Sequence, residues 1–350
     1  MQNNLPKNTP TVAVIIPFYN GHDFITRAVE SVLSQTTPPD EFVVVNDGSS
    51  PEASWMLHTL AEKMGFKVLD KENGGQGSAR NFGVSHTTAD YICFLDQDDF
   101  YLPNHIEVLL EAVDYSDKKF GWVYADLMEA DGAGNIVRTG MVHAHSTHPK
   151  TNIFDLVGRD MFVLPSAALV SRTAFESVGG FDTRFMGYED DDLFLRIFRA
   201  GFSNTFVDKP VTVWCIHPES TSYSMRMSRS RYLYFQKLCE VFPDDEDRDR
   251  FYFRDLIARR FKNLFLADAI NAIRTDKSKR SERLREHQDE ILMILKDFHG
   301  KYTTNKFVRR KDKLKLSIQT AILSLKSPVV AKLALIAWSR LKSRRTLPRG

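Results

Sequence analysis

Cysteine is scarce in this chain of 350 residues, and the few cysteines present are poorly placed for cross-linking. Cys93, Cys215 and Cys239 are an odd number, lie far apart in the sequence and form no C-x-x-C pair. Disulfide frameworks use paired cysteines, and structural zinc sites use closely spaced ones. We therefore expect neither disulfides nor structural zinc.

Long apolar runs are absent as well. No stretch approaches the roughly 20 consecutive apolar residues of a membrane-spanning helix, and the polar residues 1–10 lack the apolar core of a signal peptide. Hydrophobic residues still make up 43% of the chain, which is enough to bury a core and excludes disorder of the whole chain. These features predict a cytoplasmic protein with one large domain and an appendage, or with two domains.

The net charge is small, but it is distributed unevenly. The formal charge is +2, yet residues 301–350 contain 14 lysines and arginines and one acidic residue, Asp312. Residues 1–300 therefore contain 33 basic and 44 acidic residues, a net charge of −11. A basic end of this kind suits an anionic surface, either lipid headgroups or nucleic acid, although a solvated face is its commonest explanation.

The order of the apolar runs indicates a sheet covered by helices. Short β-branched runs alternate with helical patterns, as in βα units on a parallel sheet. We expect strands at 12–16, 42–46, 66–69 and 91–95, separated by helices at 22–34, 51–63 and 76–85. After a strand at 120–125 the pattern becomes irregular, with short strands near 165–170 and 211–215. The sequence thus predicts an α/β fold with a mostly parallel sheet flanked by helices.

From residue 225 onward the strand pattern disappears. Helical patterns cover 251–273, 281–298 and 314–340. We therefore expect a polar N-terminal tail at 1–10, an α/β domain at 11–224, and a helical region at 225–350 that ends in a basic amphipathic segment.

Four expected strands are followed by polar clusters. Ligands on open α/β sheets bind outside the carboxyl ends of the strands, so these clusters are candidates for one binding site. They are Pro17-Phe18-Tyr19-Asn20, Asn46-Asp47-Gly48-Ser49, the glycine-rich segment Asn73 to Asn81, and Asp96-Gln97-Asp98-Asp99. Each has a structural explanation when taken alone, but all four in order predict a ligand site.

The cluster after the fourth strand concentrates negative charge. Its three carboxylates repel one another, and a cation would neutralise them. Oxygen ligands favour Mg²⁺ or Mn²⁺, and such sites complete their shell with water and substrate phosphates. The cluster therefore indicates a metal-bound, phosphorylated ligand. The structural alternative is an Asp-rich turn that caps a helix beginning near Pro103.

The glycine-rich segment precedes an expected helix. Its backbone amides can approach a ligand closely, and Arg80 adds a cation that could contact phosphate or ribose oxygens. The dinucleotide fingerprint would follow the first strand and have glycine in place of Arg80, and the chain has no Walker-type sequence. Asp47 could accept a hydrogen bond from a base, on which Tyr19 could stack. An ordinary turn is the alternative for Asp47-Gly48.

A fifth cluster, Glu189-Asp190-Asp191-Asp192, precedes a helical pattern. Capping and dipole effects explain one or two of these carboxylates, and Asp192 can pair with Arg196 four residues on. A remaining carboxylate could act as general base for an acceptor hydroxyl.

Taken together, residues 11–224 resemble the family 2 glycosyltransferases of GT-A fold. The resemblance rests on the five clusters, with Gly179-Gly180-Phe181-Asp182 before the last of them and His217 after it. It implies transfer of a sugar from a nucleotide diphosphate donor, usually UDP-linked, to a hydroxyl acceptor with inversion at the anomeric carbon.

The resemblance also implies roles for individual residues. It assigns Asp47 to the base, Arg80 to donor positioning and Asp96 to the ribose. It assigns Asp98 to Mn²⁺ or Mg²⁺ and Asp190 to the general base, for which Glu189 is the adjacent alternative. The other donor contacts that it implies are Pro17, Tyr19, Asn20 and Gly75, and His217 would be a further metal or diphosphate contact. Members often have an arginine two residues before that histidine, where this chain has Cys215.

Two other classes of function compete with sugar transfer. A nucleotidyltransferase would explain the nucleotide and metal sites, but it normally has its glycine-rich loop after the first strand, where this chain has Phe18-Tyr19-Asn20. A catalytically silent module that binds nucleotides or glycans would not need acidic residues at both the metal and the base positions.

The C-terminal segment has an apolar stripe beside basic residues. Such a stripe packs on its own domain, forms a homodimer, or lies on an anionic membrane next to a glycan or lipid-linked acceptor. The last case predicts a peripheral enzyme at the inner face of the membrane. We do not expect nucleic acid as a partner. The stripe consists of Ile318, Ile322, Leu325, Val329, Leu333 and Ile336, and Ser327-Pro328 is expected to divide it into two helices.

Overall fold

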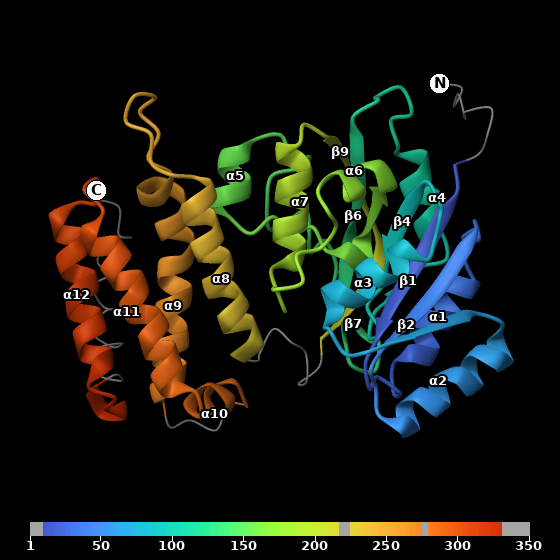
Figure 1. Ribbon diagram of the computed structural model, residues 1–350, viewed down its shortest axis with the longest axis horizontal. Coiled ribbons are helices and arrows are strands. Elements are labelled where there is room, and N and C mark those ends of the chain that lie inside the picture. Colours follow the sequence, from blue (N-terminus) through green and yellow to red (C-terminus); the bar gives the residue numbers. More distant parts are fainter. Residues whose placement is uncertain (1–9, 217–224, 275–278, 331–350) are drawn as a thin grey trace, which may run out of the picture. The chain divides into compact units, whose positions relative to one another are not determined.

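The computed structural model of the chain describes residues 10–216, 225–274 and 279–330 (Figure 1). The chain divides into two compact units, residues 1–217 and 218–350, which we call the sheet unit and the helical unit. Of the residues singled out above, His217, Leu333 and Ile336 lie outside the described part of the chain.

The first half of the sheet unit is built from βα units. Its four parallel strands lie side by side in the order β3-β2-β1-β4, and all seven residues of β1 are buried. A parallel strand that is buried on both faces is apolar throughout, which explains why the sequence pattern of β1 is clear. The strands are β1 (Val12–Phe18), β2 (Glu41–Asp47), β3 (Lys67–Lys71) and β4 (Tyr91–Phe94), and the helices between them are α1 (Ile25–Leu33), α2 (Pro51–Met64) and α3 (Gln76–Ser85).

Local signals fix the ends of these helices. At the start of α2 the Ser50 hydroxyl accepts a hydrogen bond from the Ala53 amide at 3.3 Å, and Pro51 occupies the first turn. Gly65 ends the helix in a left-handed conformation with φ of 78°. The chain then enters β3 at the edge of the sheet.

The second half of the sheet is mixed. β8 is antiparallel to both β4 and β6, whereas the long pairing of β6 with β9 is parallel, so most residue pairs in the nine-stranded sheet belong to parallel pairings. The strands are β5 (Phe100–Tyr101), β6 (Phe120–Asp131), β7 (Ile136–Arg138), β8 (Ala168–Ser171) and β9 (Ser203–Ile216). The intervening helices are α4 (His105–Glu111), α5 (Ile153–Gly158), the short 3₁₀ turn η1 (Pro165–Ala167), α6 (Arg172–Ser177) and α7 (Glu189–Arg199). The α/β fold expected from the sequence is confirmed.

The helical unit packs around phenylalanine rings. Phe235 on α8 lies 5.5 Å from Phe265 on α9 and 5.3 Å from Phe298 on α11, measured between ring centroids. All three rings are buried, so they form a shared core. The elements are α8 (Met225–Val241), the π-helical turn η3 (Phe253–Ile257), α9 (Ala258–Ile273), α10 (Lys279–Arg285), α11 (Gln288–Thr304) and α12 (Arg310–Ser324).

The C-terminal segment breaks where the sequence predicts. α12 ends at Ser324, and the Ser327 hydroxyl accepts a hydrogen bond from the Val330 amide at 3.4 Å, as an N-cap would. Across the three described ranges, no helix combines the length and apolar character needed to cross a bilayer.

Candidate functional site

Asp47, at the end of β2, organises the glycine-rich segment. One carboxylate oxygen accepts hydrogen bonds from the Lys71 ammonium at 2.6 Å and the Gly74 amide at 2.9 Å. The other accepts from the Gly75 amide at 2.8 Å. Asp47 is 3% exposed, so these partners compensate a buried charge. The carboxylate therefore anchors the loop that leads into α3.

The glycines in this region are required by the backbone. Gly48 has φ of 69°, and a Cβ atom there would lie 2.6 Å from the Asn73 backbone nitrogen. Gly75, with φ of 84°, is the residue immediately before α3. Both positions disfavour any residue with a side chain, which keeps the loop close to Asp47.

Arg80, on α3, links two clusters that are distant in sequence. One terminal nitrogen donates to Asp96 at 2.5 Å and the other donates to Glu189 at 3.1 Å. Arg80 is 1% exposed, and its guanidinium lies over the Phe181 ring at 5.1 Å. Burial alone would lower its pKa, but the carboxylates of Asp96 and Glu189 outweigh that effect and raise the pKa. Arg80 therefore remains charged and fixes the strand-end cluster against the start of α7.

The segment after β1 is held by side chains of two other clusters. The Tyr19 amide donates to the Gln97 side-chain oxygen at 2.9 Å, and the Asn20 amide donates to the Ser49 hydroxyl at 3.1 Å. The Tyr19 side chain is 46% exposed, which leaves its ring accessible to a ligand. Pro17 is buried within β1, so its side chain belongs to the sheet.

The carboxylates after β4 have different environments. Asp99 is buried and accepts a hydrogen bond from the Cys215 amide at 2.9 Å. Burial, with added repulsion from Asp98 and Asp96, holds the pKa of Asp99 well above its usual range. Asp98 is partly exposed, and its backbone carbonyl accepts from Arg27 at 3.1 Å. Three carboxylates thus lie within four residues at this strand end, Asp96 is paired with Arg80, and a bound cation would lower the repulsion between the three.

The fit of a divalent ion to this strand end rests on oxygen donors. Asp98 and its neighbours offer the carboxylates that Mg²⁺ and Mn²⁺ prefer, and such ions need only one or two of them when a diphosphate supplies the rest. Within the described residues no group of three or more His, Cys, Asp or Glu side chains is arranged to hold an ion by itself. The donor set therefore suits an ion that binds together with a phosphorylated ligand.

Three of the four carboxylates at the start of α7 have structural partners. Asp192 accepts from Arg196 at 2.7 Å, as its spacing predicts, and Asp191 accepts from the Met161 amide at 3.2 Å. Glu189 is occupied by Arg80. The acidic run is therefore largely explained by helix and loop contacts, and Asp190 is the residue left over.

Asp190 differs from these neighbours. Among the described residues it forms no ion pair, and its carboxylate accepts only the amide of Asp191 at 2.8 Å. Burial raises its pKa well above the usual range, with further contributions from Glu189, Asp191 and Asp160. A carboxylate whose pKa is raised in this way is a stronger proton acceptor than an ordinary aspartate.

Two residues of the site received no role of their own in the sequence analysis. Lys71 neutralises Asp47, and Gln97 exchanges hydrogen bonds with the backbone of Tyr19. The Lys71 contact follows from strand register, because Asp47 and Lys71 are partners in the pairing of β2 with β3. Once the strand order is known, this cation could have been found from the sequence. Gln97 gave no such signal.

Comparisons with known proteins agree with this arrangement. A family model described as glycosyl transferase family 2 matches residues 13–179, and one described as the N-terminal domain of galactosyltransferase matches residues 166–217. An uncharacterized glycosyltransferase of Rickettsia bellii is 30% identical over 212 residues, which cover 61% of this chain and 30% of that protein. The chain spans less than two thirds of the length of the Rickettsia relatives that it matches.

Solved structures share the fold at lower identity. S. aureus TarS 1–349 in complex with UDP has a TM-score of 0.60 and 17% identity, over 93% of this chain and 92% of that one. The mannosyltransferase PcManGT from Pyrobaculum calidifontis, in complex with GDP-Man and Mn²⁺, has a TM-score of 0.54 and 17% identity, over 91% of this chain and 88% of that one. The fold, the ordered strand-end clusters and the family match agree: residues 13–179 match glycosyltransferase family 2, and the chain shares the GT-A fold.

Proposed function

We propose that the sheet unit transfers a sugar, with inversion, from a nucleotide diphosphate donor to a hydroxyl group, and that the donor is UDP-linked. The observation that carries this proposal is the double ion pair of Arg80, which joins Asp96 of the strand-end cluster to Glu189 at the start of α7. A donor held at the strand ends would thereby lie beside Asp190. The nucleotides bound by TarS and PcManGT support a nucleotide-sugar donor.

The donor's nucleoside would lie over the ends of β1, β2 and β4. The Tyr19 ring is accessible for stacking on the base. Asp47 uses its oxygens for Lys71, Gly74 and Gly75, yet a carboxylate has about four acceptor positions and so retains one for a base N–H group. Asp96 is 29% exposed at its side chain and would accept from the ribose hydroxyls.

A divalent ion is part of this proposal. Asp98 would hold Mn²⁺ or Mg²⁺, with His217 as a second ligand, and the ion would neutralise charge on the leaving diphosphate. The Mn²⁺ in the complex of PcManGT supports this assignment. The chain itself places the partly exposed Asp98 after β4, two residues beyond Asp96.

Asp190 would act as the general base. In a single displacement the acceptor oxygen forms a bond to the anomeric carbon, the bond from that carbon to the diphosphate oxygen breaks, and the acceptor proton passes to Asp190. A positioned base contributes about 10²–10⁴-fold to such a step. Glu189 is the alternative, but its pairing with Arg80 commits one of its oxygens to structure.

A nucleotide-release assay tests this function. Full-length protein is incubated with UDP-GlcNAc or GDP-mannose and Mn²⁺, with and without oligosaccharide acceptors, and the free nucleotide is quantified. We expect release of UDP that is stimulated by acceptor and lost with Asp190→Asn. Nucleotide binding without release, even with acceptors, would favour the silent binding module, and pyrophosphate formation from a nucleoside triphosphate would favour a nucleotidyltransferase.

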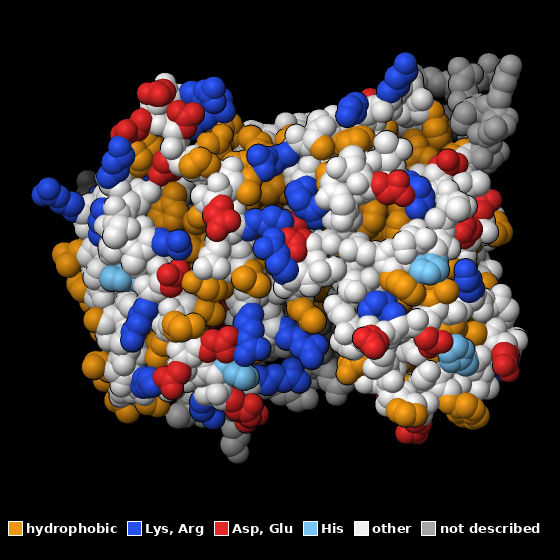
Figure 2. All heavy atoms as spheres, in the orientation of Figure 1, with side chains coloured by type: hydrophobic (Ala, Val, Ile, Leu, Met, Phe, Trp, Pro, Cys, Tyr) orange, Lys and Arg blue, Asp and Glu red, His pale blue; other side chains and the backbone are white. Residues whose placement is uncertain are grey.

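The exposed face of α12 would hold the enzyme on an anionic membrane, next to a lipid-linked acceptor. Leu314, Ile318 and Leu325 are all more than half exposed, and Lys311 and Lys315 flank the same face of the helix. Figure 2 shows hydrophobic side chains along the edge of the helical unit where α12 lies. Apolar side chains bordered by lysines suit the boundary between headgroups and acyl chains.

Co-sedimentation with phosphatidylglycerol vesicles tests this surface. We expect the doubly substituted variant Ile318→Glu/Leu325→Glu to stay in the supernatant, and Met293→Glu, at an exposed apolar position on α11, to sediment like the unaltered chain. Equal recovery of all three proteins in the supernatant, with a dimer in light scattering that only the double variant loses, would assign the face to a homodimer instead.

A further inference from the structure

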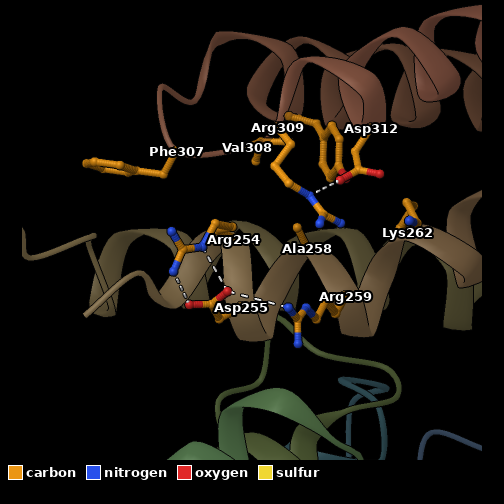
Figure 3. A pocket seen from close by; sticks show the side chains of 10 residues that line it. Arg254, Asp255, Ala258, Arg259, Lys262, Phe307, Val308, Arg309 and Asp312 are labelled. Atoms are coloured by element: carbon orange, nitrogen blue, oxygen red, sulfur yellow. Dashed lines mark hydrogen bonds and ion pairs between the residues drawn. The ribbon is translucent and has the colours of Figure 1, made fainter. Parts of the chain in front are cut away.

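The helical unit contains a pocket that none of the donor-site residues lines. One side of the pocket is formed by η3 and the first turns of α9, and the other side by the segment that leads into α12 (Figure 3). The volume of the pocket is about 380 Å³. Pockets that take small molecules begin at about 300 Å³, so this one can hold a group larger than a single ion.

Positive charge predominates among the residues that line the pocket. Four are cationic and two are acidic. Asp255 accepts two hydrogen bonds from Arg254, at 2.8 and 2.6 Å, and Asp312 accepts one from Arg309 at 2.7 Å (Figure 3). Both carboxylates are thus engaged, and the pocket retains an excess of two positive charges. The remaining cations are Arg259, which lies 3.6 Å from Asp255, and Lys262.

Lys262 is the member of this set whose charge is least compensated. It is partly buried, and among the described residues its ammonium forms neither an ion pair nor a hydrogen bond; it lies over the Tyr302 ring, 6.0 Å from the ring centroid. Burial lowers the pKa of Lys262, Lys315 and Arg259 lower it further, and Asp312 opposes them. A partly buried cation with cationic neighbours favours an anionic ligand.

The backbone presents these residues on one face. Asp255, Ala258, Arg259 and Lys262 follow a three- and four-residue spacing and so line the same side of the continuous helix formed by η3 and α9. The turn at η3 is π-helical, a local widening that often occurs at functional sites. Tyr302 and Phe307 add aromatic surface beside the charges.

We propose that this pocket binds a phosphate group carried on a small organic molecule. Guanidinium groups match phosphate oxygens through paired hydrogen bonds, and the ammonium of Lys262 supplies a point charge. The volume and the aromatic wall accommodate the organic part of a phosphate ester. The same chemistry is presented by an anionic lipid headgroup and by a soluble sugar phosphate.

Calorimetric titration of the full-length chain with glycerol 3-phosphate tests the site. We expect saturable binding that glycerol does not reproduce, and that weakens about tenfold or more in Lys262→Gln, because a charge-assisted contact to the phosphate is lost. Lys262→Arg should largely restore it. Arg309→Gln, at a side chain that is 69% exposed, should also weaken binding, and it keeps the test independent of any folding defect at Lys262.

Lys306→Gln is the matched control. Lys306 is 67% exposed, pairs with Glu246 and does not line the pocket, so its removal should leave binding unchanged. Equal affinities of the unaltered chain, Lys262→Gln and Arg309→Gln would overturn the proposal, and so would equal binding of glycerol and glycerol 3-phosphate.

Vesicles separate the two sources of phosphate. If the natural ligand is a lipid headgroup, vesicles containing phosphatidic acid should bind the chain in a manner that depends on Lys262, and glycerol 3-phosphate should compete with them. If it is a soluble ester, vesicle binding should be the same in Lys262→Gln while binding of glycerol 3-phosphate is still lost. UDP binding should be unchanged by either substitution, so failure of the donor-site proposal is distinguishable from failure of this one.

Discussion

The ends of β2 and β4 and the start of α7 are both crowded with acidic side chains, but the two regions treat their charge differently. Asp47 is matched by a lysine and two backbone amides, and Asp96 is matched by Arg80 and Gln76. At α7 one carboxylate, Asp190, has no ion pair within the described residues and has a raised pKa. Compensated charge gives a rigid surface for binding, whereas a carboxylate of raised pKa is suited to accepting a proton.

The sharpest way to break this comparison is to remove charge at the two adjacent positions of α7. Asp190→Asn keeps the shape of the side chain but loses the proton acceptor, so turnover should fall about 10²–10⁴-fold with little change in donor affinity. Glu189→Gln should lower turnover less, since Glu189 acts through Arg80. Nucleotide release and donor titration on both variants check this, and the reverse order would place the base at Glu189.

Arg80→Leu tests how far the donor region depends on compensated charge. It leaves Asp96 and Glu189 without their shared cation, and losing one partner of a buried ion pair costs about 3–5 kcal/mol of unfolding free energy. The exposed pair of Arg138 with Glu129 supplies the control, because Arg138→Gln should cost less than about 1 kcal/mol. Unfolding of both variants in guanidinium chloride measures the difference in unfolding free energy. Similar unfolding midpoints would contradict the linking role of Arg80.

Asp47→Asn should have the next largest effect. Its charged acceptor holds Lys71, Gly74 and Gly75, so we expect the loop to loosen and donor affinity to fall about 10–100-fold, equivalent to about 1.5–3 kcal/mol. Asp70→Asn, in the neighbouring strand and 56% exposed at its side chain, should change affinity far less. Calorimetric titration with UDP compares the affinities of the two variants. Equal affinities would mean that Asp47 stabilises the sheet and its loop but does not contribute to donor binding.

The pH dependence of turnover should report the unusual carboxylate. The base must be ionised, so activity should be lost as the pH falls through the raised pKa of Asp190, at a higher pH than the value of about 3.9 for an ordinary aspartate. Glu189→Gln removes a neighbouring negative charge, which should lower the pKa of Asp190 and move the loss of activity to lower pH. A pH–rate profile of both proteins checks the shift, and coincident limbs would mean that Asp190 is not the titrating group.

The sequence was most informative where burial is simple. β1 and most of β2 and β4 are buried and apolar, so their positions were predicted closely. β9 was predicted at 211–215 only, because its first half is polar and partly exposed. α8 was missed because its inward face includes Ser228, which donates a hydrogen bond to Asp268 on α9, and Arg231, which forms an ion pair with the same carboxylate. A buried polar face has no apolar periodicity to detect.

The candidate site was predictable as a set of strand-end clusters but not as a network. The pairing of Arg80 with Glu189 joins residues that are 109 positions apart, and no local pattern indicates it. The same limit applies to the four carboxylates of α7, since the partners of Glu189 and Asp191 come from α3 and from the segment before η1. Only for Asp192 did the sequence spacing identify a partner, which is Arg196 four residues further on.

The central claim, a metal-dependent nucleotide site at the strand ends, is tested most directly by calorimetric titration of the full-length chain with UDP in Mn²⁺. We predict saturable binding that EDTA abolishes and that Asp98→Ala greatly weakens, with unfolding midpoints unchanged. Asp23→Ala, at a carboxylate that is 76% exposed after β1, should bind UDP like the unaltered chain. UDP binding that is the same with EDTA, in Asp98→Ala and in Asp47→Ala would contradict the placement of the donor at this site.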